Sequence, residues 1–160
     1  MTAQTLDRTL TCYRIGDPNG AYPIFDATGS TLAPGRWNTP GSPMIYTALH
    51  FSTALLEKLV HGSGRLPPNQ HYVEITVPRG LSYEMFSQPA LPGWDAMPPT
   101  VSKAFGERWC IERRSAVLLV PSVVARLDDN VLINPAHPEF GAITAGLHRP
   151  VYWDSRLFGA

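Results

Sequence analysis

This chain of 160 residues has little charge and no excess of either sign. Charged residues make up 16% of the sequence, and 13 lysines and arginines balance 13 aspartates and glutamates. Globular proteins usually carry about 25% charged residues. A chain without a basic excess has no electrostatic field that would attract nucleic acid or an anionic membrane. The composition therefore argues against direct nucleic-acid binding and against binding to a membrane surface.

Cysteine is also scarce, and the two cysteines do not form a motif. Cys12 and Cys110 are separated by most of the chain, without a Cys-x-x-Cys pair or a nearby histidine cluster. This spacing excludes a disulfide scaffold and a zinc site, so both thiols are expected to be reduced. The five histidines also lack metal-site spacing, and no metal is expected. They are His50, His61, His71, His137 and His148.

Long hydrophobic runs are absent as well. No uninterrupted apolar stretch reaches the length needed to cross a bilayer, and the first residues lack a basic segment followed by an apolar core. The expected compartment is therefore the cytoplasm. A length of 160 residues with 44% hydrophobic residues suits a single domain, residues 1–160, with its own core. The 16 prolines and 13 glycines fall between apolar segments, which predicts a fold rich in loops.

Segments of strand and helix character alternate along the chain. Apolar or alternating β-prone runs predict strands at 9–15, 44–46, 71–78, 116–121 and 130–135. Helical patterns with end signals predict two helices, at 52–61 and 100–114. The proline-broken segment 81–99 is predicted to be a wrapped loop. Mixed strands with a few helices predict an α+β fold with mixed or antiparallel sheets.

The predicted helix at 52–61 carries a candidate catalytic carboxylate, that of Glu57. Thr47 or Ser52 is a candidate N-cap, and the glycines of 62–64 supply a left-handed stop. Glu57 borders the apolar face of the helix instead of pointing squarely away from it. That face consists of Leu55, Leu56, Leu59 and Val60.

An arginine, an aromatic residue and this carboxylate fall within a short span. Arg36 lies in Gly35-Arg-Trp-Asn38, where a guanidinium beside a glycine suits an anionic ligand. Tyr46 offers a stacking face, and Glu57 offers charge for a cationic transition state. Together they favour a nucleotide site. The ordinary alternatives are a surface arginine bonded to loop carbonyls, a core tyrosine with its hydroxyl satisfied, and a solvated glutamate paired with a neighbour on the helix.

Three further residues are weaker candidates. Arg14, near the end of the first strand, would bind a phosphate with a second guanidinium group or form a salt bridge. Ser122 follows the apolar run 116–121 and is equally suited to begin a turn; no Gly-x-Ser-x-Gly elbow marks it as a nucleophile. Asn134, in Asn-Pro-Ala-His-Pro, would shape a pocket or hold a turn at the sheet end, and the turn is favoured.

The order of these residues resembles the RES-domain toxins of the RES–Xre type II toxin–antitoxin systems, a family named for Arg, Glu and Ser. The resemblance covers roughly residues 13–156, and five short motifs in the expected order make it specific. They are Gly35-Arg-Trp-Asn38, Ile45-Tyr-Thr47, Leu55-Leu-Glu57, Val120-Pro-Ser122 and Asn134-Pro-Ala-His-Pro138.

The resemblance implies a fold related to the ADP-ribosyltransferases, with NAD+ as substrate and no separate cofactor. The bond attacked joins nicotinamide to ribose, and the developing sugar cation needs a carboxylate nearby. The implied catalytic residues are Arg36, Tyr46, Glu57 and Ser122, converging on one cleft. Arg36 and Arg14 would hold phosphate, and Tyr46 would stack against the nicotinamide side. Glu57 would engage the ribose and the cation, Ser122 the ribose or phosphate, and Asn134 would line the substrate pocket.

The implied function is a toxin that consumes NAD+ as a glycohydrolase or phosphorylase and arrests growth. The alternatives are a protein ADP-ribosyltransferase, a catalytically inactive partner-binding module, and a nucleotide hydrolase unrelated to NAD+. The implied partner is a small Xre-like antitoxin that blocks the NAD+ pocket and supplies DNA binding to the complex. A homodimer within that complex is implied by the family alone.

Overall fold

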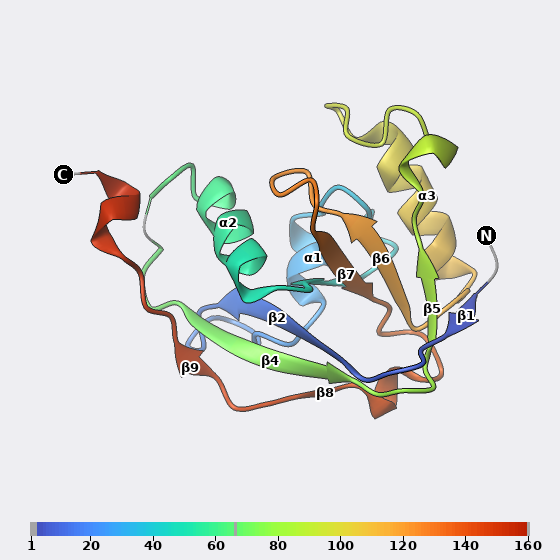
Figure 1. The fold of residues 1–160 in the computed structure, drawn as a ribbon, viewed down its shortest axis with the longest axis horizontal. Helices are drawn as coiled ribbons and strands as arrows, with labels where there is room; N and C mark the ends of the chain where they lie inside the picture. The colour runs from blue at the N-terminus through green and yellow to red at the C-terminus, as the bar shows by residue number, and fades with distance from the viewer. Residues whose placement is uncertain (1–2, 66, 160) are drawn as a thin grey trace.

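The computed structural model describes residues 3–65 and 67–159, which form a nine-stranded sheet and three α-helices (Figure 1). The α+β prediction is confirmed. No helix of these residues is long and apolar enough to cross a membrane. The helices are α1 (Thr28–Leu32), α2 (Phe51–His61) and α3 (Thr100–Ile111), with 3₁₀ turns η1 (Gln88–Ala90), η2 (Phe140–Ala142) and η3 (Ser155–Phe158). The strands are β1 (Gln4–Thr5), β2 (Leu10–Gly16), β3 (Ile45–Ala48), β4 (His71–Val77), β5 (Ser82–Met85), β6 (Val117–Pro121), β7 (Asp129–Ile133), β8 (Thr144–Ala145) and β9 (Arg149–Pro150).

The sheet consists of two halves, β1-β5-β6-β7-β3 and β2-β4-β8 with β9, which meet at a narrow seam between β3 and β2. Strand order is β1-β5-β6-β7-β3-β2-β4-β8, with β9 also paired to β4. All pairs are antiparallel except β5 with β6. At the seam, β2 pairs with β3 only through Tyr13 and Ala48, whereas β2 pairs with β4 along its whole length. Figure 1 shows β2, β4 and β8 crossing the lower part of the molecule, below β6 and β7.

Arg14 bonds across this seam. Its Nη1 donates to the carbonyl oxygen of Tyr46 on β3 at 2.8 Å, and its Nε donates to that of Ile24 at 2.6 Å. A strand that leaves its neighbour exposes backbone carbonyls, which are unfavourable to bury without donors. The Arg14 guanidinium supplies such donors where the backbone ladder is missing.

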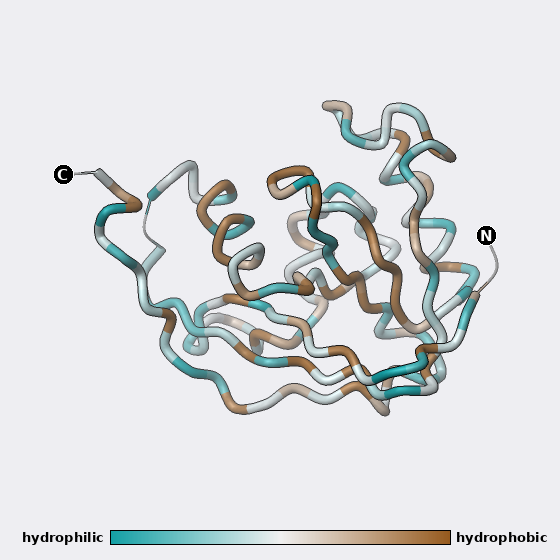
Figure 2. Tube along the Cα trace, in the orientation of Figure 1, coloured by the Kyte–Doolittle hydropathy of each residue, from teal (hydrophilic) through white to brown (hydrophobic). Residues whose placement is uncertain are grey.

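The centre of the core is built on β6 and β7, which appear as hydrophobic runs in the middle of Figure 2. Every residue of β6 is buried, as expected for a strand covered on both faces. Side chains of β7 alternate between the faces: Val131 and Ile133 pack with β2 and β4, while Leu132 packs with Trp37 and Trp109. Thus one face of the β6–β7 region is covered by the other half-sheet, and the opposite face by α3.

Helix α2 matches the prediction in extent but not in its cap or buried face. His50, extended at φ −120° and ψ 143°, precedes it without a side-chain cap. The predicted caps were wrong, because Thr47 lies in β3 and donates to Val131, and Ser52 is inside the first turn. Leu56 and Val60 are 42% and 56% exposed, whereas the buried residues are Thr53 and Ala54. Small side chains on that face bring the helix close to the strands.

The chain beyond α2 has the predicted left-handed glycine at Gly64 but not at Gly62. Gly62 has φ −85°, while Ser63 and Gly64 adopt the left-handed conformation.

The segment 81–99, predicted to be a loop, contains a strand, β5, which lies parallel to β6. A buried ion pair anchors it: Glu84 is 1% exposed and accepts from Arg114, with its Oε2 3.1 Å from Nη2. The prediction failed there because this partner comes from a distant segment.

Both cysteines are buried and free, which confirms the predicted reduced thiols. Burial raises the pKa of Cys12 and of Cys110 to about 11. At neutral pH both side chains are therefore neutral thiols and behave as small apolar residues.

Helix α3 lies directly on the backbone of Trp37, and Gly106 permits this contact. A Cβ atom built on Gly106 would stand 1.8 Å from the Trp37 carbonyl oxygen, far inside van der Waals contact. Trp37 itself is 3% exposed and packs against Phe86, Trp94 and Phe105. The glycine therefore sets how closely α3 approaches the segment that contains Arg36.

We expect Gly106→Ala to lower the free energy of unfolding by about 1–3 kcal/mol, as overpacking does. In an unobstructed helix the same change stabilises by roughly 1 kcal/mol, so the sign is informative. Gly141→Ala is the control, because its added Cβ meets no atom within 4 Å. Urea unfolding followed by circular dichroism measures both. An unchanged or raised midpoint for Gly106→Ala would rule out the close packing of α3 on Trp37.

Candidate functional site

Glu57 and Ser122 meet although 65 residues separate them. Glu57 Oε1 accepts a hydrogen bond from Ser122 Oγ at 2.8 Å and another from Asn130 Nδ2 at 2.8 Å. Ser122 is fully buried, and Glu57 is partly exposed. Because both donors bind one oxygen, they fix the plane of the carboxylate and leave Oε2 as the oxygen without a donor among the described residues.

The loop between β6 and β7 holds Ser122 in this orientation. The Ser122 amide donates to the Asp128 carbonyl at 2.9 Å, and the Ala125 amide donates to Ser122 Oγ at 3.0 Å. Thr53 on α2 donates to Asp128 Oδ2 at 2.7 Å. Ser122 therefore begins a turn and also donates to Glu57, so the two interpretations of this serine are compatible. Two side-chain bonds tie α2 to the loop.

Arg36 extends from a turn whose polar groups are paired internally. Asn38, fully buried, accepts from the Gly35 amide and from Tyr46 Oη, each at 2.8 Å. Tyr46 Oη in turn accepts from the Trp37 amide at 3.0 Å. A Cβ on Gly35 would come within 2.7 Å of the Tyr46 ring, so glycine is needed there. Burial raises the pKa of Tyr46, which keeps its phenol neutral.

Lys103 of α3 closes the same turn from the other side. Its Nζ donates to the carbonyl oxygens of Gly35 at 2.8 Å and Asn38 at 2.9 Å. The segment Gly35–Asn38 is therefore held by its own Asn38 side chain and by residues from two other elements, Tyr46 of β3 and Lys103 of α3. Such a frame fixes the backbone from which the Arg36 side chain extends.

The Arg36 guanidinium binds neutral groups only. Nη1 donates to the carbonyl oxygens of Ala96 at 2.8 Å and Trp94 at 3.1 Å, and Nη2 lies 3.4 Å from the Met97 sulfur. Neither Arg36 nor Arg14 forms a salt bridge within residues 3–65 and 67–159, whereas Arg114 and Arg126 do. Their charges are thus not neutralised by a contacting carboxylate, which suits binding of an anion.

A second cation lies near Arg14 at the seam. Burial lowers the pKa of Arg14. Lys58 follows Glu57 on α2, and its pKa is lowered by burial first and by the Arg14 charge second. The predicted pairing of Glu57 with Lys58 or His61 is not observed, since the Glu57 hydrogen bonds go to Ser122 and Asn130. Two cations, Arg14 and Lys58, therefore lie near the seam, with Asp26 acting on Arg14 and Asp17 acting on Lys58.

The β6–β7 loop links the Glu57 group to the Arg36 group. Ser122, at its start, binds Glu57, and Arg126 lies 5.5 Å from the Trp94 ring centroid. Arg126 also pairs with Asp95 at 2.8 Å and holds the pKa of Asp95 below its usual range, with Arg36 adding the smallest contribution. The structure brings Glu57 together with Ser122, and Arg36 extends from the turn that Tyr46 holds. Convergence of all four side chains on one cleft stays a prediction.

Asn134 lies apart from Glu57, beyond the opposite end of β7. It is fully buried, donates to the Cys110 carbonyl at 2.9 Å and accepts from the Ala136 amide at 3.0 Å. Asn130 binds Glu57 at the start of the same strand. These contacts favour the turn interpretation of Asn134 over a role in the substrate pocket.

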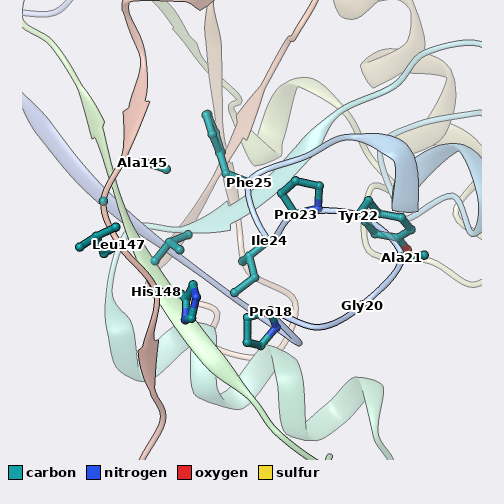
Figure 3. Close-up of a pocket in the computed structure, with 12 residues that line it drawn as sticks. Pro18, Gly20, Ala21, Tyr22, Pro23, Ile24, Phe25, Ala145, Leu147 and His148 are labelled. Carbon is teal, nitrogen blue, oxygen red and sulfur yellow. The ribbon is translucent and has the colours of Figure 1, made fainter.

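A cavity of about 580 Å³ opens on the other side of the sheet (Figure 3). Its lining includes His148 and also Ile24 and Val73, which belong to the core cluster of Val131 and Ile133. Asn130 alternates with Val131 and so points to the opposite face. The cavity is therefore separate from the Glu57 group.

Sequence reasoning missed Asn38, Lys103 and Asn130. Asn130 had a detectable signal, because it is a polar residue directly before the apolar run Val131–Ile133. Lys103 on a helix surface had none. Among the described residues, no group of three or more histidine, cysteine, aspartate or glutamate side chains is placed to hold a metal ion.

Comparison with known proteins gives a consistent set of relatives. Residues 11–154 match the RES domain family. The chain is 40% identical to the Prs ADP-ribosylating toxin of Sphingobium sp. (strain YBL2), covering 93% of this chain and 97% of that protein. It is 34% identical to a Toxin Res of Pseudomonas putida, covering 86% and 95%.

A solved structure shares the fold. The M. tuberculosis MbcT–MbcA toxin–antitoxin complex contains a chain that matches with a TM-score of 0.73 at 16% identity, covering 92% of this chain and 86% of that one. The matched family domain and the toxins at 40% and 34% identity extend over nearly the whole chain. The chain therefore belongs to the RES-domain family of toxins.

Proposed function

We propose that this protein consumes NAD+ by cleaving the bond between nicotinamide and ribose, as the toxin of a toxin–antitoxin pair. The observation that carries the proposal is the Glu57 carboxylate, held on Oε1 by two donors, with no donor to Oε2 from the described part of the chain. The name of the Sphingobium relative, an ADP-ribosylating toxin, supports NAD+ as the substrate.

Glu57 suits the demands of this bond cleavage. When nicotinamide leaves with the bonding electrons, positive charge develops on the ribose, and a fixed carboxylate lowers the free energy of that state. Oε2 is free to accept a ribose hydroxyl or to face the developing charge. Ser122 is buried and donates to Oε1, so it acts by orienting the carboxylate.

Arg36 and Arg14 are the proposed phosphate-binding residues. Both are held by backbone carbonyls, so their guanidinium planes are positioned before an anion arrives. For Tyr46, the geometry supports holding the Arg36 turn through its hydroxyl. Stacking of its ring against nicotinamide stays a prediction.

A second candidate is transfer of ADP-ribose to a protein. The name of the relative at 40% identity favours it, and that name gives Prs as the target. Both reactions share cleavage of the same bond and differ in the acceptor, which is water or phosphate in one and a side chain in the other. Prs is therefore the first protein acceptor to test.

We further propose an Xre-like antitoxin that covers this site and supplies DNA binding, within a complex that contains a toxin dimer. The matching fold comes from a toxin–antitoxin complex. Exposed apolar side chains also occur on each segment that carries the site. Leu127 in the β6–β7 loop is 102% exposed, Met97 beside Arg36 is 77% exposed, and Leu56 beside Glu57 is 42% exposed. Such side chains suit a covering protein partner.

Glu57→Gln should reduce the rate of NAD+ consumption by about 10²- to 10⁴-fold, because the amide keeps the shape but loses the charge. Glu74→Gln, at an exposed position on β4, is the matched control and should keep the wild-type rate. Purified protein is incubated with NAD+, with and without phosphate and Prs, and products are identified by mass spectrometry.

The product identifies the acceptor. Loss of NAD+ in buffer alone indicates hydrolysis, loss only with phosphate indicates phosphorolysis, and a mass increase on Prs indicates transfer. If wild-type protein consumes no NAD+ under any of these conditions and expression is tolerated without a partner, the inactive binding module replaces this proposal. A fully active, folded Glu57→Gln protein would remove Glu57 from the mechanism.

Tyr46→Phe separates the two roles of Tyr46, because phenylalanine keeps the ring and removes the hydroxyl. We expect the free energy of unfolding to fall by about 1–3 kcal/mol, since Asn38 and the Trp37 amide lose a buried partner. The KM for NAD+ should rise severalfold as the Arg36 turn loosens. Tyr83→Phe is the control, because that hydroxyl bonds Gln4 at the surface. Wild-type stability and KM in Tyr46→Phe would favour stacking alone.

A further inference from the structure

Asn130 reaches Glu57 from a rigid position in the middle of the sheet. It lies in β7, where it is opposite Val120 of β6 on one side and Ala48 of β3 on the other. Its Nδ2 donates to Glu57 Oε1 at 2.8 Å. Because β7 is paired on both edges, this donor is positioned more firmly than one carried by a loop.

The orientation of the Asn130 amide is fixed by Glu57 and not by its other neighbours. Its Oδ1 is buried and has no hydrogen-bond partner among the described residues. Rotating the amide by 180° would place a carbonyl oxygen against a carboxylate oxygen, which is repulsive. An unpartnered buried acceptor lowers stability, and the next three residues of the strand are fully buried and apolar. Among the described residues, the bond to Glu57 is the one hydrogen bond of the Asn130 side chain.

We propose that Asn130 is a positioning residue for the reaction of Glu57. This inference rests on the proposed NAD+ cleavage. Asn130 and Ser122 bind the same carboxylate oxygen from the two ends of the β6–β7 connection. Ser122 lies at the start of the loop and Asn130 lies in the following strand, so together they hold the Glu57 side chain in one rotamer. The free Oε2 then keeps a constant direction toward the sugar.

Asn130→Leu tests positioning against a purely structural role. The change removes the donor to Glu57 and also removes the unpartnered oxygen. We expect the rate constant kcat for NAD+ consumption to fall about 10- to 100-fold, the scale of misplacing a reacting group by an ångström. The KM should stay within about twofold, because Asn130 is not proposed to touch NAD+. Circular dichroism and thermal unfolding should show a folded protein.

Asn130→Asp adds a readout that a structural role does not produce. Two adjacent carboxylates do not ionise together readily, so the pair with Glu57 holds one shared proton. While that proton is present, the protonated aspartate donates to Glu57 as the asparagine does. As pH rises and the proton leaves, repulsion separates the two groups. The kcat of this variant should therefore gain a descending limb at rising pH that the wild type lacks. Asn19→Asp, at an exposed turn position, is the charge-matched control.

The possible outcomes distinguish the role of Asn130 from the proposed NAD+ cleavage on which it rests. Wild-type protein that consumes NAD+, together with folded Asn130 variants that keep its kcat and pH profile, overturns the role of Asn130 alone. Variants that lose activity only in proportion to their unfolded fraction also overturn it. Wild-type protein that leaves NAD+ unchanged with water, phosphate and Prs overturns the proposed function and this inference together.

Discussion

The hydrogen bonds to one oxygen of Glu57 are the interaction on which the rest of the site depends. They join helix α2, the loop that begins at Ser122 and the strand that contains Asn130. A partly exposed glutamate on a helix is normally free to change rotamer in water. Here two donors from the sheet side restrict it, and a third bond, from Thr53 to Asp128, keeps helix and loop together. The carboxylate is therefore oriented by the fold before any ligand binds.

The fold also positions the Arg36 cation, which lies on the other side of the β6–β7 loop from Glu57. The Gly35–Asn38 turn pairs its polar groups with Tyr46 and Lys103, and the Arg36 side chain extends from it to backbone carbonyls of the segment 94–96. The close approach of α3 through Gly106 holds this turn against the core. The residues of the turn divide the work: Trp37 and Asn38 are buried and structural, and Arg36 carries the charge. A short motif can thus be specific although only one of its side chains carries a charge.

The sequence was sufficient where local pattern decides structure. The alternation at 71–78 and the apolar run at 116–121 predicted β4 and β6, and the helix containing Glu57 was placed nearly to its ends. It was insufficient where the structure depends on a partner that is distant in the sequence. The strand around Glu84 depends on Arg114, and the buried face of α2 depends on how closely small residues let it approach β2 and β3. The pairing of Glu57 with Ser122 came from family resemblance, whereas Asn130, outside the motifs, was found only in the structure.

The seam between the two half-sheets connects these observations. Because β2 and β3 share a single residue pair, the sheet opens there, and backbone groups of β3 need donors from elsewhere. Arg14 supplies one, which places a buried guanidinium close to the helix that carries Glu57 and Lys58. A continuous ladder would have satisfied the same carbonyl without adding charge. The break in the sheet thus places a buried cation near the helix that carries the fixed carboxylate of Glu57. The proposed cleavage of NAD+ would use both charges, a cation for the phosphates and a carboxylate for the reacting sugar.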